Sequence, residues 1–180
     1  MEEEKLNLGC GMDLLPGYTN IDIQKHLNIP PNIIFRKGDC KNLSYFKDKS
    51  ISEIYAKGLV EHIHPLNIKE YLYEWNRVLK INGKLILIFP DFDAVVSDYK
   101  QCKNLKSLDD FMMFLAMNYA ILNTNQSETV RSDSHRSLIT PKFLKLLLKS
   151  EGFLIDSIVP YDKECNRYTK KLIAKKVRID

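Results

Sequence analysis

Short strand-like segments alternate with helix-like segments along this chain of 180 residues, and this alternation constrains the fold more than any other feature. Amphipathic runs predict helices over 68–79 and 141–149, the second with Thr140 as N-cap, Pro141 in its first turn and Gly152 just beyond its end. Strands separated by helices form parallel sheets that are covered by those helices, so the pattern predicts an α/β domain. The runs that predict strands cover residues 5–8, 18–23, 33–36, 51–56, 84–89, 153–159 and 171–179.

The chain contains no repeat, low-complexity tract or linker, and we therefore expect a single domain over residues 1–180. The least regular stretch is 92–136, which holds an apolar segment predicted to be helical over 108–122 and a polar loop over 123–135. An insertion after a central strand starts at the carboxyl ends of the strands, where ligands bind in α/β sheets. We expect residues 92–136 to form a lid over the substrate.

Charge and composition exclude several classes of protein. Hydrophobic residues make up 44% of the chain and charged residues 28%, as in globular domains, and the formal net charge is only +4. Lysines and arginines are scattered, so no DNA-binding surface is expected. The one basic cluster is predicted to be the solvated face of the last strand, and it contains Lys170, Lys171, Lys175, Lys176 and Arg178.

The cysteines and the apolar segments bear on the cellular compartment. Cys10, Cys40, Cys102 and Cys165 lie far apart and without the spacing of zinc ligands, which disfavours a disulfide framework and fits a reducing cytoplasm. The chain starts without a signal-like segment, and its longest apolar stretch, 111–122, is too short to span a membrane. We expect a cytoplasmic protein without membrane insertion.

Glycines and acids follow the first three predicted strands. Gly9-Cys10-Gly11 comes directly after the first strand, where glycine lets the backbone approach a ligand closely. Asp22 ends the second strand, where a carboxylate can accept both hydroxyls of a ribose, and Asp39 after the third could accept from an adenine amino group. The third glycine of the dinucleotide motif is missing, because Met12-Asp13-Leu14 follows instead, and this disfavours NAD.

Nearly the whole chain resembles the class I S-adenosylmethionine-dependent methyltransferases. The resemblance implies a Rossmann-like methyltransferase fold with a mostly parallel seven-stranded sheet and an antiparallel last strand. Only eleven positions separate Gly11 from Asp22, which implies that the first helix is shortened or absent. The segments similar to family motifs are Leu6–Gly11, Asp22, Gly38–Asp39, Ile54–Ile63 and Trp75–Leu85, the last of which looks like the family's W-x-R-V-L-K-P-G-G-x-L.

Further segments resemble a compact bacterial branch that is often associated with surface-polysaccharide synthesis, namely Pro90–Phe92, His135–Ser137 and Glu151–Phe153. The resemblance implies S-adenosylmethionine as the cofactor. Gly58 stands where a histidine is common in this branch, so that histidine's role has no counterpart here. The residues implied to bind the cofactor are Leu8, Gly9, Cys10, Gly11, Asp22, Ile23, Asp39, Cys40, Lys57 and Leu59.

The sulfonium of this cofactor is an activated methyl donor, so the protein mainly aligns the acceptor, and an oxygen acceptor usually also needs a general base. His135 is the first candidate, because a histidine titrates near ~6.5. His62, Asp91 and Asp133 are the others, and Asp91 could instead orient the base or bind a sugar hydroxyl. Each also has a purely structural explanation as a cap, turn or loop residue. Two acids and two histidines leave metal dependence open, but no ligand spacing supports a metal site, and none is assigned.

The resemblance favours O-methylation of a sugar hydroxyl, in a glycan or its precursor. The chain lacks an Asn/Asp-Pro-Pro-aromatic run and a Pro-Cys pair, so methylation of DNA bases is disfavoured. Three alternatives remain open: a methyltransferase acting on another small metabolite, natural product or RNA, a cofactor-binding module without turnover, and a nicotinamide-dependent oxidoreductase.

Overall fold

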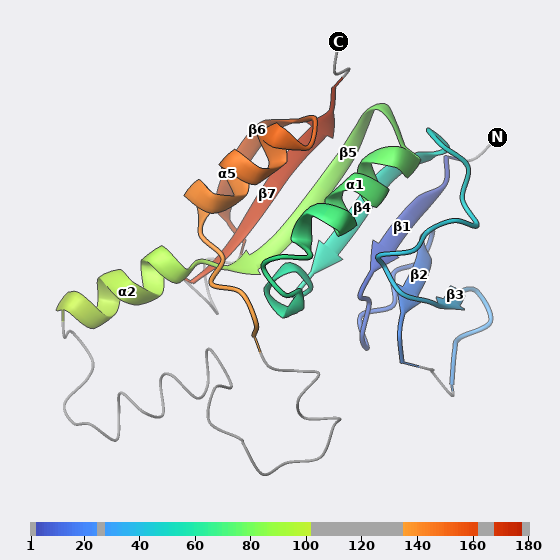
Figure 1. The fold of residues 1–180 in the computed structure, drawn as a ribbon. Coiled ribbons are helices and arrows are strands. Elements are labelled where there is room, and N and C mark those ends of the chain that lie inside the picture. Colours follow the sequence, from blue (N-terminus) through green and yellow to red (C-terminus); the bar gives the residue numbers. More distant parts are fainter. Residues whose placement is uncertain (1–2, 25–27, 102–134, 162–167, 178–180) are drawn as a thin grey trace.

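A seven-stranded sheet forms the centre of the computed structural model, which describes residues 3–24, 28–101, 135–161 and 168–177 (Figure 1). The strand order is β3-β2-β1-β4-β5-β7-β6. Strands β1 to β5 pair in parallel, whereas β7 is antiparallel to both of its neighbours, which confirms the predicted sheet. The strands are β1 (Lys5–Leu8), β2 (Thr19–Asp22), β3 (Ile34–Lys37), β4 (Ile51–Lys57), β5 (Leu79–Pro90), β6 (Phe153–Pro160) and β7 (Thr169–Lys176).

Two helices cover one face of this sheet, α1 (Ile68–Val78) and α5 (Pro141–Ser150) (Figure 1). Their apolar sides share one core with alternate residues of the strands, because successive side chains of a strand point to opposite faces. Leu72 and Trp75 enter this core from α1, and Leu144 and Leu148 enter it from α5. The predicted capping of α5 is confirmed, since the Thr140 hydroxyl accepts a hydrogen bond from the Phe143 amide.

Turns replace a helix between β1 and β2. Residues 9–18 form turns only, which confirms that the first helix is absent. Asn20, fully buried, holds this loop in place of helical hydrogen bonds. Its side-chain oxygen accepts from the Leu15 amide and from Asn7 Nδ2, and its amide nitrogen donates to the carbonyls of Leu15 and Ile34. A single buried amide therefore satisfies the backbone of a loop that packs against the sheet.

Two predicted elements differ from the structure. β5 begins at Leu79 rather than residue 84, because α1 passes directly into it. Asn82 and Gly83 lie inside the strand at a bulge, where Asn82 has φ +63°. The beginning of the predicted irregular stretch is helical, as α2 (Phe92–Gln101), so that prediction was wrong there. Residues 102–134, with the predicted helix 108–122 and the candidate Asp133, lie outside the described residues.

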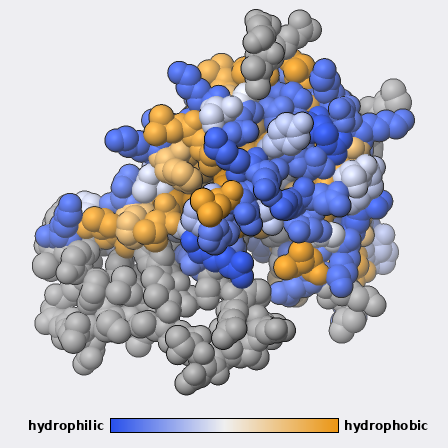
Figure 2. Space-filling model, viewed as in Figure 1, coloured by the Kyte–Doolittle hydropathy of each residue, from blue (hydrophilic) through white to orange (hydrophobic). Residues whose placement is uncertain are grey.

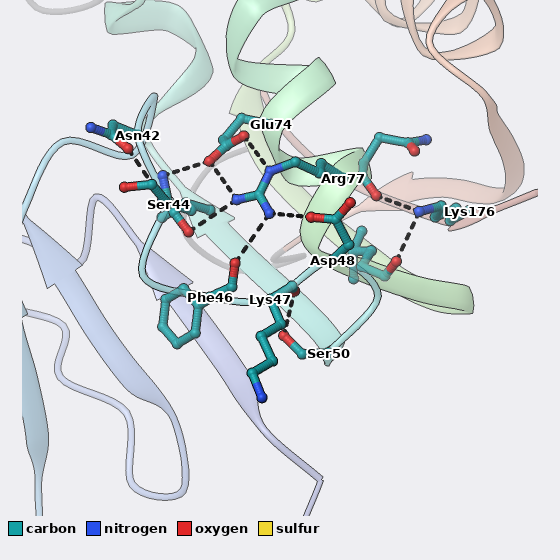
Figure 3. A network of polar contacts seen from close by, with 12 residues as sticks. Asn42, Ser44, Phe46, Lys47, Asp48, Ser50, Glu74, Arg77 and Lys176 are labelled. Carbon is teal, nitrogen blue, oxygen red and sulfur yellow. Dashed lines mark hydrogen bonds and ion pairs between the residues drawn. The ribbon is translucent and has the colours of Figure 1, made fainter.

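Lys176 corrects the prediction of a solvated basic face on the last strand. The residue is buried, and its Nζ donates to the carbonyls of Asn76 and Leu79 at 2.6 and 2.9 Å (Figure 3). The last carbonyls of a helix have no partner within the helix, so an ammonium group from β7 can satisfy those at the end of α1. Lys170, Lys171 and Lys175 of the same strand are partly exposed.

The amphipathic character of α1 is visible on the molecular surface. Figure 2 shows a largely hydrophilic face over α1, with hydrophobic residues exposed over α5 and α2. Leu146 of α5 is 66% exposed. Of the helices that the structure describes, none has both the length and the apolar character needed to cross a membrane.

Candidate cofactor and acceptor site

The loop after β1 adopts a conformation that favours glycine. Gly9 has φ +61° and Gly11 has φ +48°, in the left-handed region where other residues are strained. A Cβ atom placed on Gly9 would lie 2.7 Å from Leu59 Cδ1, in the segment that follows β4. The loop after β1 and the segment after β4 are therefore packed against each other at Gly9.

Asp22 joins the end of β2 to this loop. Its Oδ2 accepts a hydrogen bond of 2.9 Å from the Gly11 amide, and its Oδ1 accepts one of 2.8 Å from the Gln24 amide. The residue is 9% exposed. Each carboxylate oxygen keeps a further lone pair, so Asp22 can hold the loop and still accept hydroxyl groups of a ligand.

Cys40 and Asp39 lie at the end of β3, on the other side of Asp22. Cys40 is buried, its thiol accepts a hydrogen bond from the Gly9 backbone, and burial raises its pKa to about 12. Burial also raises the pKa of Cys10 to about 12, so both thiols are neutral at physiological pH and neither is an activated nucleophile. Asp39 is exposed, and its Oδ1 accepts from the Lys41 amide.

The other residues implied to bind the cofactor have different surroundings. Leu8 is fully buried in the core, so only its backbone is available to a ligand. Ile23 is 59% exposed. The Nζ of Lys57 lies 2.6 Å from Asp13 Oδ2, in an ion pair on the exposed side of the loop. Gly9 thus packs against Leu59 and donates a hydrogen bond to Cys40, and Gly11 donates one to Asp22. Lys57 forms an ion pair with Asp13.

A second group of ionisable residues combines two residues of the short helix η1 (Val60–His62), which follows β4, with His135 from the segment before α5. The rings of His62 and His135 have centroids 5.0 Å apart and are nearly perpendicular. Glu61 completes the group, since one ligand atom of each of the three residues lies within 4.8 Å of the others. We call Glu61, His62 and His135 the Glu-His-His cluster.

Backbone hydrogen bonds hold the two chain segments of this cluster together. The Glu61 carbonyl accepts from the amides of Arg136 and Ser137, at 2.7 and 3.0 Å. The buried Ser137 hydroxyl donates to the Ile63 carbonyl. His135 is therefore placed beside His62 by the chain itself, although the two residues are separated by more than seventy positions in the sequence.

Glu61 was missed among the residues proposed from the sequence. Its side chain is 3% exposed, and burial raises its pKa to about 7. One signal could have identified it: Val60-Glu61-His62 lies in the segment compared with the family's fourth-strand motif, in which the glutamate directly precedes the histidine.

Asp91 is placed at the end of β5, as the sequence predicted, and there it caps a helix. Its Oδ1 accepts from the Asp93 amide in the first turn of α2, and its carbonyl accepts from Val95. The residue is 5% exposed, and the Nζ of Lys170 lies 3.9 Å from Asp91 Oδ2. These contacts fit a structural role for Asp91, which is one of the two explanations that the sequence left open.

Trp75 and Arg77 of the motif-like segment Trp75–Leu85 have structural roles. Trp75 is fully buried, and its Nε1 donates to the Cys40 carbonyl at 2.9 Å. The Arg77 guanidinium donates to both Glu74 oxygens, to Asp48, and to the carbonyls of Leu43 and Phe46 (Figure 3). Helix α1 thus fixes the segment between β3 and β4, which begins with the candidate cofactor residues at the end of β3.

Comparisons with known proteins bear on the fold and the family. Residues 6–87 match a family model described as a methyltransferase domain. A search of curated proteins finds no significant match to this chain. A SAM-dependent methyltransferase from Archaeoglobus fulgidus has the same fold, with a TM-score of 0.66 at 17% identity, covering 97% of this chain and 86% of that chain.

A second structure, a SAM-dependent methyltransferase from Methanosarcina mazei, is similar with a TM-score of 0.62 at 21% identity. The similarity covers 98% of this chain and 94% of that chain. These structures confirm the predicted Rossmann-like methyltransferase fold. Together with the family match, they support S-adenosylmethionine as the cofactor.

Proposed function

We propose that this chain is an S-adenosylmethionine-dependent methyltransferase that methylates a hydroxyl oxygen, specifically a sugar hydroxyl of a glycan or its precursor. The observation that carries the proposal is the contact between two strand ends. β1 and β4 are parallel neighbours, with Leu8 opposite Ala56, so their carboxyl ends lie side by side. The glycine loop follows one strand, and Leu59, Glu61 and His62 follow the other.

The residues at the ends of β1, β2 and β3 fit an adenosyl group. We assign the ribose hydroxyls to the remaining lone pairs of Asp22 and the adenine amino group to Asp39. At Gly11 a Cβ would meet no heavy atom within 4 Å, so there is open space beside the backbone, whereas Gly9 packs against Leu59. When bound, the cofactor supplies a methyl group on a positively charged sulfur, which needs no further activation by the protein.

The cluster is separated from Leu59 by one residue of the chain, Val60, so an acceptor beside it would lie close to the cofactor pocket. We assign to His135 the removal of the proton from the acceptor hydroxyl as the oxygen bonds to the methyl carbon and the carbon–sulfur bond breaks. His62 packs against His135 and helps to fix its ring. The sugar acceptor is supported by the resemblance of Pro90–Phe92 and His135–Ser137 to the compact branch.

The test is methyl transfer to defined acceptor classes: free sugars, nucleotide sugars, oligosaccharides and RNA. We expect transfer to a sugar hydroxyl, and a loss of roughly 10²-fold or more in turnover for His135→Ala, with unchanged affinity for S-adenosylhomocysteine. His64→Ala is the matched control, because His64 is an exposed histidine two residues after the helix η1. Transfer to RNA alone would refute the sugar acceptor, and full turnover of His135→Ala would remove His135 from the reaction.

A further inference from the structure

The Glu-His-His cluster contains a buried carboxylate oxygen for which the described part of the chain supplies no hydrogen-bond partner. This atom is Oε2 of Glu61, a residue that is only 3% exposed. A buried polar atom without a partner costs free energy, and in a native protein it calls for a specific explanation. The atom lies in the same cluster as His62 and His135, which are partly exposed and so leave the cluster open to solvent on one side.

We propose that Glu61, His62 and His135 bind one divalent transition-metal ion, with Zn²⁺ as the best fit. Two imidazoles and one carboxylate are a ligand set of catalytic zinc sites, in which three protein ligands leave one position open. Mg²⁺ and Ca²⁺ prefer oxygen ligands and fit this set poorly.

The distances are compatible with this ion. The ligand atoms lie within 4.8 Å of one another, whereas ligands around a tetrahedral Zn²⁺ with bonds near 2.1 Å are about 3.4 Å apart. Binding would require the side chains to move closer together. The two segments that carry them are already held together, since the amides of Arg136 and Ser137 donate to the Glu61 carbonyl.

The position of the ion suggests its use. The open coordination site would face the region in which the proposed function places the acceptor oxygen, and a bound metal ion lowers the pKa of an oxygen ligand. Both imidazoles would then be ligands, so with the ion bound His135 would act on the hydroxyl through the ion, in place of the direct proton removal assigned to it in the metal-free protein. This use depends on the proposed function, whereas binding of the ion does not.

The experiment titrates Zn²⁺, and separately Co²⁺, into full-length protein that carries no histidine tag and has been treated with a chelator. We expect one ion per chain, ligand-field absorption bands for Co²⁺, and no comparable binding of Mg²⁺. Glu61→Gln, His62→Ala and His135→Ala should each weaken binding by at least ~10-fold, the lower end of losses reported for residues that merely support metal ligands. His64→Ala should bind as the wild type does.

Each variant is first checked for cooperative thermal unfolding, and the isosteric Glu61→Gln guards against loss of the fold through a cavity. Absence of stoichiometric binding, or wild-type affinity in any of the three folded variants, would overturn the metal site. The same chelated protein is titrated with S-adenosylhomocysteine. Cofactor binding without ion binding refutes only the metal site, and ion binding without cofactor binding refutes only the proposed function.

Discussion

Gly9 and Gly17 lie on the same loop and share a backbone conformation that strains other residues, but the surroundings of the two glycines differ. Both have positive φ angles, +61° and +77°. A Cβ on Gly17 would have no heavy atom within 4 Å, whereas one on Gly9 would displace the Leu59 side chain. The pair therefore separates backbone strain from the close packing that the candidate pocket requires.

We predict that Gly9→Ala and Gly17→Ala each lower the free energy of unfolding by about 1–2 kcal/mol, because alanine is strained at positive φ. Only Gly9→Ala should also weaken binding of S-adenosylhomocysteine, since Leu59 must move out of the packing at the pocket. Chemical denaturation and calorimetry measure the two effects. Equal affinities of the two variants for S-adenosylhomocysteine would show that the loop at Gly9 does not contact the cofactor.

At the scale of elements, α1 connects the core to the candidate site. Its inner side supplies Trp75, which fixes the Cys40 carbonyl, and its last turn supplies Arg77, which holds the segment 43–48. Hydrogen bonds to Arg77 hold the pKa of Glu74 below its usual value. The Glu74 carboxylate also accepts from the Leu43 amide, so its charged form stabilises the connection between helix and loop.

This shift predicts a pH dependence of stability. Because the pKa of Glu74 is lower in the folded state than its usual 4.5, its contribution is fully present above that value and is lost as the pH falls through the folded-state pKa. Glu74→Gln should therefore be less stable than the wild type near neutral pH, and the difference should shrink between about pH 5 and pH 3. Denaturation at several pH values measures it. Glu70→Gln, at an acid on the exposed side of the same helix, is the control, and a constant difference for Glu74→Gln would contradict the assigned ion pair.

At the scale of the whole molecule, Lys176 joins the last strand to the middle of the chain. Its ammonium group, on β7, binds carbonyls at the junction of α1 and β5, about a hundred residues earlier in the sequence. The preceding residue on the strand, Lys175, points to the opposite face and pairs with Asp156 in a partly exposed ion pair. Neighbouring lysines thus have structural roles that composition alone does not distinguish.

Lys176→Met is predicted to lower the free energy of unfolding by roughly 1–3 kcal/mol, because two buried carbonyls lose a charged donor. Lys175→Met should change it by less than about 1 kcal/mol, the usual range of an exposed ion pair. Thermal and denaturant unfolding of both variants provide the measurement. Similar losses in the two would mean that the carbonyls at the end of α1 find other partners.

The sequence was sufficient to predict the seven strands apart from the start of β5, helices α1 and α5, and the shortening or loss of the first helix. These follow from local features: apolar periodicity, the Thr140 cap, and the short interval between Gly11 and Asp22. Contacts between distant residues were not predictable in the same way. The burial of Lys176 depends on where α1 ends beside β7, and a pattern of alternating residues does not contain that information.

The candidate site shows the same contrast between local features and contacts of distant residues. The residues after β1, β2 and β3 were identified because strand ends in a parallel sheet meet at one edge. The Glu-His-His cluster was not, because Glu61 and His62 are joined to His135 only by tertiary hydrogen bonds across a long sequence interval. The single domain, the lid over 92–136 and the individual site roles stay predictions.

We propose that this chain binds S-adenosylmethionine at the ends of β1, β2 and β3. Calorimetric titration of the protein with S-adenosylhomocysteine tests this binding. We predict one site per chain with a dissociation constant on the order of micromolar, and a loss of roughly 1–3 kcal/mol in Asp22→Ala. Asp156→Ala, at an acid on β6 that pairs with Lys175, should keep the wild-type affinity. No binding by the folded wild-type protein, or unchanged affinity in Asp22→Ala, would contradict the account.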